Sequence, residues 1–294
     1  MSALVTFLPL NVGGALALVC VFAAMTAMGI AARPARVIAH EIPVRPILAA
    51  LVVALVIVPL VAIGLGRGLD LQDGALAGLV LMGISPGAPL ALRRSHQAGA
   101  DAEFALVLQV AVAVLAIPAV PLWILFLKLA FGREAGLSVL VLARQIFMAQ
   151  LLPLGSGIIL RRIAPDLSHR LLRPLLLASG VLMLVVVLLL VALSWESFDA
   201  LPPKALAASA SLSSTALLFA YLGCGPSATR RMSAGAICAL RNPGIALLIA
   251  SANGLPDDAR VMVVAHVLVT AAVLSVFLIL MRRIKAEAPL ATAS

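Results

Sequence analysis

Charged residues are scarce in this sequence. Of its 294 residues, 11% are charged and 63% are hydrophobic, and the mean hydropathy is +1.18. A soluble domain averages about 25% charged and about 45–50% apolar residues, so a soluble globular protein is excluded. Apolar runs long enough to cross a bilayer recur from end to end. They predict one transmembrane domain, residues 1–294, built from membrane-spanning α-helices.

Cysteine and catalytic patterns are equally scarce. Cys20, Cys224 and Cys238 form no CxxC pair, so we expect buried packing residues rather than a disulfide or metal site. The sequence has no Walker A motif, metal-ligand spacing or nucleophile–base pattern, and we expect neither an enzyme nor a cofactor. The net charge of +9 does not indicate nucleic acid, because the basic residues stand in short pairs at the ends of apolar runs.

The apolar runs divide into nine expected spans. Their bounds are 3–30, 46–66, 73–92, 102–130, 137–160, 171–193, 204–222, 232–252 and 259–281. With the amino terminus outside, 14 Lys and Arg fall in inner loops and 5 in outer loops, as the positive-inside rule requires. We therefore expect an integral protein of the bacterial inner membrane, with its carboxyl terminus in the cytoplasm.

Two of the spans are interrupted. Pro86 and Gly87 fall near the inner end of the third span, and Asn242-Pro243-Gly244 falls near the middle of the eighth. Proline removes a backbone donor, so such breaks need protein or a water-filled cavity around them. One interrupted span in each half of the chain indicates a secondary transporter built from inverted repeats. Two ordinary proline kinks in a helix bundle are the alternative.

Three stretches of the chain resemble the bile acid:sodium symporter family. They are Val58-Pro59-Leu60, then Gly83-Ile84-Ser85-Pro86-Gly87-Ala88 followed by Asp101, and Arg241-Asn242-Pro243-Gly244-Ile245-Ala246-Leu247. The second is similar to the family's GCCPGG…GD signature, and the third is similar to its QNSGLAL. The resemblance implies an all-α fold of nine transmembrane helices in inverted repeats, with the two broken helices crossing.

The resemblance also implies two subdomains. A panel would hold the spans 3–30, 137–160 and 171–193, and a core would hold 46–66, 73–92, 102–130, 204–222, 232–252 and 259–281. The substrate would lie between core and panel, near the crossing. The residues expected there are Pro86, Gly87, Gln109, Arg144, Arg241, Asn242, Pro243 and Gly244.

The family's sodium ligands are replaced in this chain. The positions that the resemblance assigns to side-chain ligands hold Ala54, Ala91, Leu92, Ala105, Gln109, Ile237 and Arg241. Alanine, leucine and isoleucine offer no side-chain oxygen to a hard cation. Arg241 would repel a cation at ~4 Å by ~4 kcal/mol at an effective dielectric of ~20. We therefore expect no bound metal and doubt the sodium sites, although carbonyls of the breaks, helped by Gln109 and Asn242, could still serve as ligands.

Arg241 is the most informative single residue. It lies about ten residues inside the eighth span, roughly 15 Å from the end of that span, and no carboxylate is left in the interior of any span. Its partner is then either backbone or a substrate anion. Arg144 faces either the substrate cavity or the interface. His266 is either a packing residue or a proton relay.

The sequence therefore predicts a secondary active or facilitative transporter that moves a small organic anion through the bilayer by alternating access. A sodium-coupled symporter of bile-acid-type anions and a non-transporting receptor or scaffold are the alternatives. The sequence specifies neither the substrate nor the oligomeric state.

Overall fold

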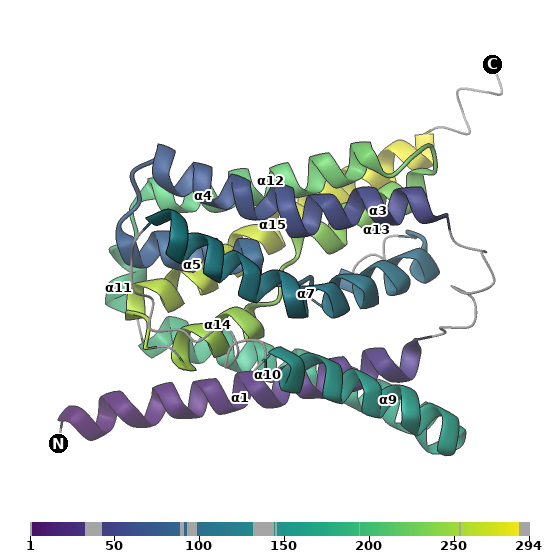
Figure 1. The fold of residues 1–294 in the computed structure, drawn as a ribbon, viewed down its shortest axis with the longest axis horizontal. Helices are drawn as coiled ribbons and strands as arrows, with labels where there is room; N and C mark the ends of the chain where they lie inside the picture. Colours follow the sequence, from purple (N-terminus) through teal and green to yellow (C-terminus); the bar gives the residue numbers. More distant parts are fainter. Residues whose placement is uncertain are drawn as a thin grey trace.

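The computed structural model describes residues 2–32, 43–88, 91–92, 99–131, 144, 146–193, 195–252 and 254–287. Within these ranges the chain is helical, with one isolated two-residue bridge in place of any strand (Figure 1). Five helical stretches are each long and apolar enough to cross a membrane: Val44–Gly68, Ala102–Leu127, Pro165–Leu189, Pro203–Gly223 and Asp257–Arg283. The all-helical class is confirmed, and the count of nine spans stays a prediction.

The helices follow one another with short connections. In chain order they are α1 (Ser2–Ala31), α3 (Val44–Val52), η1 (Val53–Ile57), α4 (Val58–Gly68), α5 (Asp73–Ile84), α7 (Ala102–Phe131), η2 (Phe147–Leu151), α9 (Leu152–Ile163), α10 (Pro165–Leu193), α11 (Trp195–Asp199), α12 (Pro203–Gly223), α13 (Ala228–Ala239), α14 (Pro243–Ala252) and α15 (Asp257–Glu287). α10 begins six residues before the predicted span 171–193, because Pro165 suits the first position of a helix. Residues 137–143 of the fifth predicted span lie outside the described residues.

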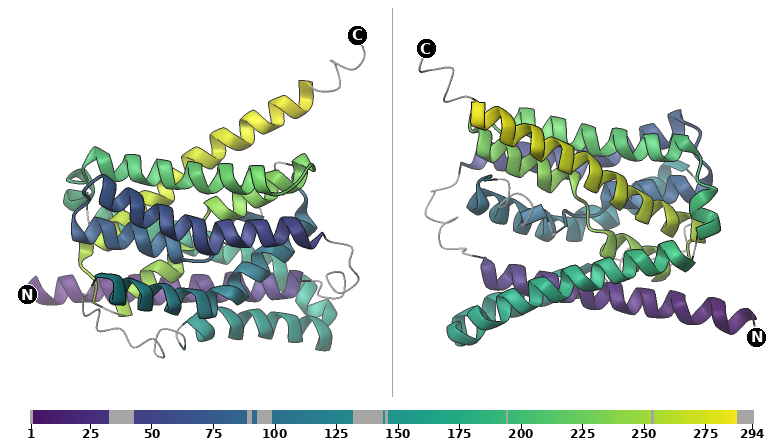
Figure 2. Two further views of the ribbon diagram at one scale, coloured as in Figure 1. Left: turned by 45° about the horizontal axis from the view of Figure 1, so that its top comes forward. Right: turned by 180° about the vertical axis from the view of Figure 1, so that it is seen from behind.

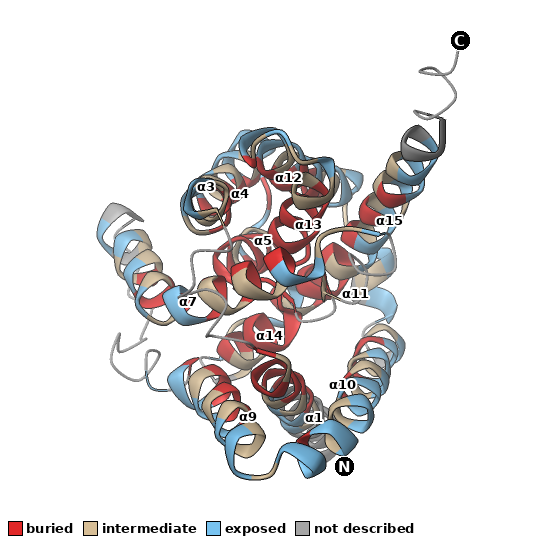
Figure 3. Ribbon diagram, turned by 90° about the vertical axis from the view of Figure 1, so that its right-hand side faces the viewer, coloured by how far each residue is buried: buried red, intermediate tan, exposed pale blue. Residues whose placement is uncertain are grey.

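The helices form two groups. α1, α9 and α10 pack together on one side of the molecule, and α3, α4, α12 and α13 lie on the other, with α5 and α14 between them (Figures 2 and 3). Two hydrophobic clusters match this arrangement, and α13 and α14 belong to different ones. The break between α13 and α14 therefore lies where the chain passes from one cluster to the other. A functional division into panel and core remains a prediction.

Two π-helical segments interrupt the regular helices. η1 and η2 each end one residue before a proline-containing turn, with Pro59 and Pro153 at the second position of the following helix. In η1 the Val58 N–H bonds to the Val53 carbonyl, five residues earlier. Pro59 has no N–H, so at the same five-residue spacing the carbonyl group of Ala54 receives no donor from its own helix. The indole Nε1 of Trp123 donates to the Leu55 carbonyl at 2.7 Å.

The carboxyl end of α1 is held by a side chain from α9. Nη1 of Arg161 donates to the carbonyl groups of Ile30, Ala31 and Ala32 at 2.9, 3.3 and 3.0 Å. The last four carbonyls of a helix have no partner within the helix, and the negative end of the helix dipole favours a cation there. Arg161 therefore caps α1 from a helix far along the chain.

Replacing Arg161 with alanine is expected to lower the free energy of unfolding by about 1–2 kcal/mol, because the terminal carbonyls of α1 lose a charged donor. The control is Arg162→Ala at the next position, which is exposed and should cost less than about 0.5 kcal/mol. Unfolding in detergent, followed by circular dichroism during titration with sodium dodecyl sulfate, measures both. Equal losses in the two variants would show that the cap does not stabilise α1.

Candidate functional site

The two predicted helix breaks meet in the structure. Gly87 and Arg241 form an antiparallel bridge between the segment after α5 and the segment between α13 and α14. The Ala88 N–H donates to the Leu240 carbonyl at 2.7 Å, and the Asn242 N–H donates to the Pro86 carbonyl at 2.7 Å. Each break thus satisfies backbone groups that the other has freed from its helix. We call these residues, 85–88 and 240–242, the crossing.

Arg241 lies at the centre of the crossing, and its side chain is only 2% exposed. Its Nη2 atom donates to the Ala54 carbonyl at 2.5 Å and to the Gly83 carbonyl. The Ala54 carbonyl is free because Pro59 supplies no N–H. The Gly83 carbonyl is free because α5 ends at Ile84. Arg241 therefore connects η1 and the carboxyl end of α5, and its positive charge lies at the negative end of the α5 dipole.

The other residues of the breaks complete this backbone pairing. Asn242 caps α14, because its Oδ1 accepts from the N–H groups of Gly244 and Ile245 at 3.1 and 3.4 Å. Nε2 of Gln109, from α7, donates to the Gly87 carbonyl at 2.5 Å. A Cβ atom at Gly87 would lie 2.7 Å from Oε1 of Gln109 and 3.0 Å from the Ile237 carbonyl oxygen, so a larger residue there would have to displace the Gln109 side chain.

Most of the positions that the resemblance assigns to sodium ligands are buried near the crossing, whereas Leu92 is half-buried. Ala54, Ala91, Ala105 and Ile237 are at most 1% exposed. They present methyl groups or an aliphatic chain where a hard cation would need oxygen. No group of three His, Cys, Asp or Glu side chains that could hold a metal occurs among the described residues. Alanine and isoleucine at these four positions offer no side-chain oxygen to a sodium ion, whereas Gln109 offers its Oε1.

Several buried polar atoms near the crossing have no hydrogen-bond partner in the described part of the chain. They are Oγ of Ser85, Oε1 of Gln109, Nε and Nη1 of Arg241, Nδ2 of Asn242 and both ring nitrogens of His266. His266, in α15, is 1% exposed. Buried polar groups that lack protein partners commonly bind water, an ion or a ligand.

Arg144 lies apart from this cluster. Its side chain is exposed, while its neighbours 132–143 and 145 lie outside the described residues. Gln150, in η2, is fully buried, and both of its side-chain polar atoms lack a partner among the described residues. The sequence analysis missed Gln150. Its signal was an amide two residues before Leu152-Pro153, inside an apolar run.

Asp101, which the family resemblance places at the aspartate of the GD signature, has a structural role here. Oδ1 of Asp101 accepts from the Phe104 N–H at 3.0 Å and so caps α7, and Oδ2 pairs with Nε of Arg230 at 3.3 Å. The Asp101 carbonyl also accepts from Oγ of Ser233 at 2.8 Å. Asp101 therefore joins the start of α7 to α13.

Comparison with known proteins assigns the family. Residues 18–200, more than half of the chain, match the model of the sodium bile acid symporter family, whereas no curated protein gives a significant match. The matched stretch contains the first break and ends before the second. Members of this family are membrane transporters rather than enzymes, and the apolar helices fit an integral membrane protein. The resemblance seen in the sequence is confirmed, and the chain belongs to the sodium bile acid symporter family.

Proposed function

We propose that the protein moves a small organic anion across the membrane by alternating access, as a secondary active or facilitative transporter, and that it does so without the family's sodium sites. One observation carries the proposal. The guanidinium of Arg241 donates to the carbonyls of Ala54 and Gly83, and Arg241 stands at the position where the family resemblance places a glutamine of the sodium site.

Arg241 supplies what a bound cation supplies at helix breaks. The carbonyls of Ala54 and Gly83 point their negative ends at the guanidinium of Arg241, so both already have a positively charged partner. A sodium ion at ~4 Å from Arg241 would be repelled by ~4 kcal/mol at an effective dielectric of ~20. The neighbouring Ala54, Ala105 and Ile237 offer no side-chain oxygen that could offset this repulsion.

The charge balance of the interior supports an anionic substrate. Arg241 is the one charged side chain among the described residues that is buried, and no buried carboxylate accompanies it there. Its Nε and Nη1 atoms retain hydrogen-bonding capacity, as does Nδ2 of Asn242. An anion that reaches the crossing would find donors and a positive charge. Neutral or cationic substrates would gain nothing from that charge.

Nine spans, inverted repeats and a core moving against a panel belong to the same proposal. The two breaks are hydrogen-bonded to each other, and α1, α9 and α10 pack together apart from α3, α4, α12 and α13. Both features support a core that moves as one body. Proton coupling through His266 is disfavoured, because a protonated imidazole would add a second buried positive charge to that of Arg241, and no buried carboxylate among the described residues would offset it.

Uptake into proteoliposomes tests the proposal. The full chain is reconstituted with radiolabelled taurocholate and with a panel of mono- and dicarboxylates, under an inward gradient of sodium, potassium or protons. Uptake of at least one anion is expected, with rates that differ by less than about twofold between sodium and potassium at matched membrane potential.

A sodium-gradient stimulation of tenfold or more would overturn the loss of the sodium sites and favour the sodium-coupled alternative. Stimulation by a proton gradient that disappears in His266→Gln would assign coupling to His266 instead. Absence of uptake for every anion, from protein shown to be folded, would reject transport and leave the receptor alternative.

A further inference from the structure

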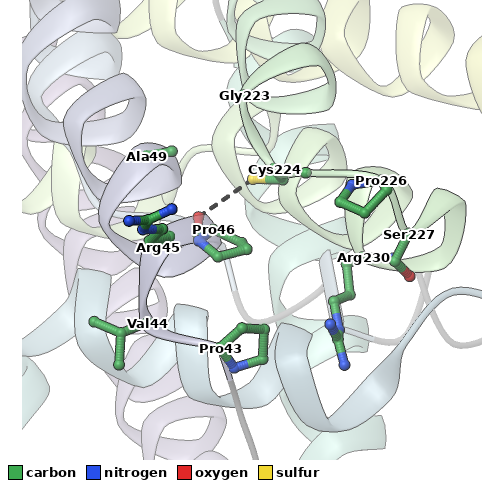
Figure 4. A pocket seen from close by; sticks show the side chains of 11 residues that line it. Pro43, Val44, Arg45, Pro46, Ala49, Gly223, Cys224, Pro226, Ser227 and Arg230 are labelled. Carbon is green, nitrogen blue, oxygen red and sulfur yellow. Dashed lines mark hydrogen bonds between the residues drawn. The ribbon is translucent and has the colours of Figure 1, made fainter.

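A second candidate site lies far from the crossing, at the end of the bundle where α3 begins and α12 ends. A pocket with a volume of about 690 Å³ opens there between the first turn of α3 and the turn that joins α12 to α13 (Figure 4). Arg45 and Arg230 line it from its two walls, together with Ser227. The positive-inside pattern predicts that this end faces the cytoplasm.

The pocket walls are tied together. The thiol of Cys224 donates to the Pro46 carbonyl at 3.3 Å, which fixes the α12–α13 turn against α3. Burial raises the pKa of this thiol to about 11, so it keeps its proton and remains a donor. Gly225 holds the turn with a φ of +76°, a conformation that glycine adopts readily. The pocket is therefore part of the packed bundle rather than a gap between loose loops.

The described protein leaves the charge of Arg45 unpaired and pairs the charge of Arg230 only in part. Arg45 makes no hydrogen bond or ion pair with any described residue, and its side chain is exposed. Arg230 contacts Asp101 through Nε alone, at 3.3 Å, and both side chains remain about one-third exposed. The next residue, Arg231, turns away, because its Nε donates to the Tyr221 carbonyl and its guanidinium lies 4.6 Å from the Tyr221 ring centre.

An apolar path leads out of the pocket along the membrane-facing side of α3 and α4. Val44 lines the pocket, and four further residues at four-residue spacing continue its face through η1 and α4. All are at least 44% exposed: Val44, Leu48, Val52, Val56 and Leu60. Residues four apart are neighbours on a helix surface, so the five form a continuous stripe that turns gradually around the helix axis. A hydrocarbon chain that starts at the pocket can therefore follow this face into the bilayer.

We propose that this pocket binds an anionic phospholipid, with the phosphate group between Arg45 and Arg230 and an acyl chain along the stripe from Val44 to Leu60. Guanidinium groups bind phosphate oxygens through paired, charge-assisted hydrogen bonds. Basic pockets between helices on the cytoplasmic side of membrane proteins recognise anionic lipid headgroups in this way. A free phosphate would satisfy the arginines but would leave the apolar path without a role.

The test uses the full chain in detergent micelles, with increasing phosphatidylglycerol, phosphatidylcholine or inorganic phosphate. The apparent melting temperature measures binding, and native mass spectrometry counts retained lipids. Phosphatidylglycerol is expected to raise the melting temperature saturably and to remain bound at one molecule per chain. Arg45→Gln should raise the half-maximal phosphatidylglycerol concentration by about fivefold, and Arg45→Gln/Arg230→Gln by more.

Arg231→Gln is the matched control. It removes the same charge at the residue next to Arg230, and the Arg231 side chain does not line the pocket. It should leave the half-maximal concentration unchanged even where it lowers the baseline stability. Arg45→Gln should fold normally, so it remains informative if the double variant does not. Three results would each overturn the lipid assignment. They are an equal rise of the melting temperature with phosphatidylcholine, an unchanged half-maximal phosphatidylglycerol concentration in Arg45→Gln, and a saturable rise of the same size with inorganic phosphate alone.

Discussion

Replacing Arg241 with alanine is expected to lower the free energy of unfolding by about 3–6 kcal/mol. The substitution removes the donor to the Ala54 and Gly83 carbonyls, and both carbonyls are buried without a donor from their own helices. A charge-assisted hydrogen bond contributes about 1.5–3 kcal/mol, and an orphaned buried carbonyl costs a similar amount. Arginine in a bilayer also has an insertion cost, which alanine would remove. This cost is present in the folded state and in an unfolded chain that stays inserted in the membrane, so its removal does not offset the loss of stability.

Two further variants at this position separate charge from hydrogen bonding. Arg241→Lys keeps the charge, whereas Arg241→Gln keeps a neutral donor and restores the residue of the family signature. If the charge stabilises the ends of the breaks, lysine should retain more stability than glutamine. Unfolding by sodium dodecyl sulfate, with Arg162→Ala as the exposed control, gives the ranking. An alanine variant as stable as the native protein would show that Arg241 does not hold the crossing together.

Gly157→Ala is expected to have the second largest effect, by separating α1 from α9. A Cβ atom at this position would lie against the Thr26 carbonyl, 2.8 Å from the Ile30 amide nitrogen and 3.0 Å from the Gly29 Cα. These neighbours are backbone atoms, which cannot rotate aside as a flexible side chain does. Close backbone contact through small residues is a common way in which membrane helices pack. The loss of stability should reach about 3 kcal/mol, at the upper end for overpacking.

Gly155→Ala provides the matched control on the same helix. A Cβ at Gly155 has no atom within 4 Å. Alanine there should leave stability unchanged or raise it by about 0.5–1 kcal/mol through its higher helix propensity. Melting temperatures of the two variants in one detergent provide the comparison. A loss of similar size at both positions would mean that glycine flexibility, and not the close contact of α1 and α9, matters in this helix.

The two helix breaks could be predicted from the sequence because proline and glycine act locally. Pro86-Gly87 and Asn242-Pro243-Gly244 interrupt the helices near the residues expected, and the backbone bonds between them fit the crossing that the family resemblance implies. The bonds themselves could not be read from composition, since they join segments about 150 residues apart. The assignment to the family rested on short motifs, and the family match confirms it.

Arg241 was expected to use backbone carbonyls or an anion, and the structure identifies two carbonyls. The free carbonyl in η1 could have been predicted from the sequence. Pro59 withholds an N–H, so an unpaired carbonyl four or five residues earlier follows from the sequence alone. That it points at Arg241 depends on tertiary packing. The Arg161 cap on α1 shows the same limit. The position of Arg161 in the sequence indicated a membrane boundary, but it did not indicate that Arg161 would bind the end of α1.

The guanidinium at the crossing also has an electrical consequence. If the crossing shifts along the membrane normal during the transport proposed above, the charge of Arg241 moves through part of the transmembrane electric field. A unit charge moved across 100 mV changes the free energy by about 2.3 kcal/mol. A monovalent anion bound beside Arg241 would cancel that charge, so the loaded carrier would move without electrical work. Movement of the empty carrier would carry the unbalanced charge of Arg241 through the field and would involve electrical work. A potential that is negative inside would then hold the empty carrier facing the cytoplasm, and voltage would set its resting state.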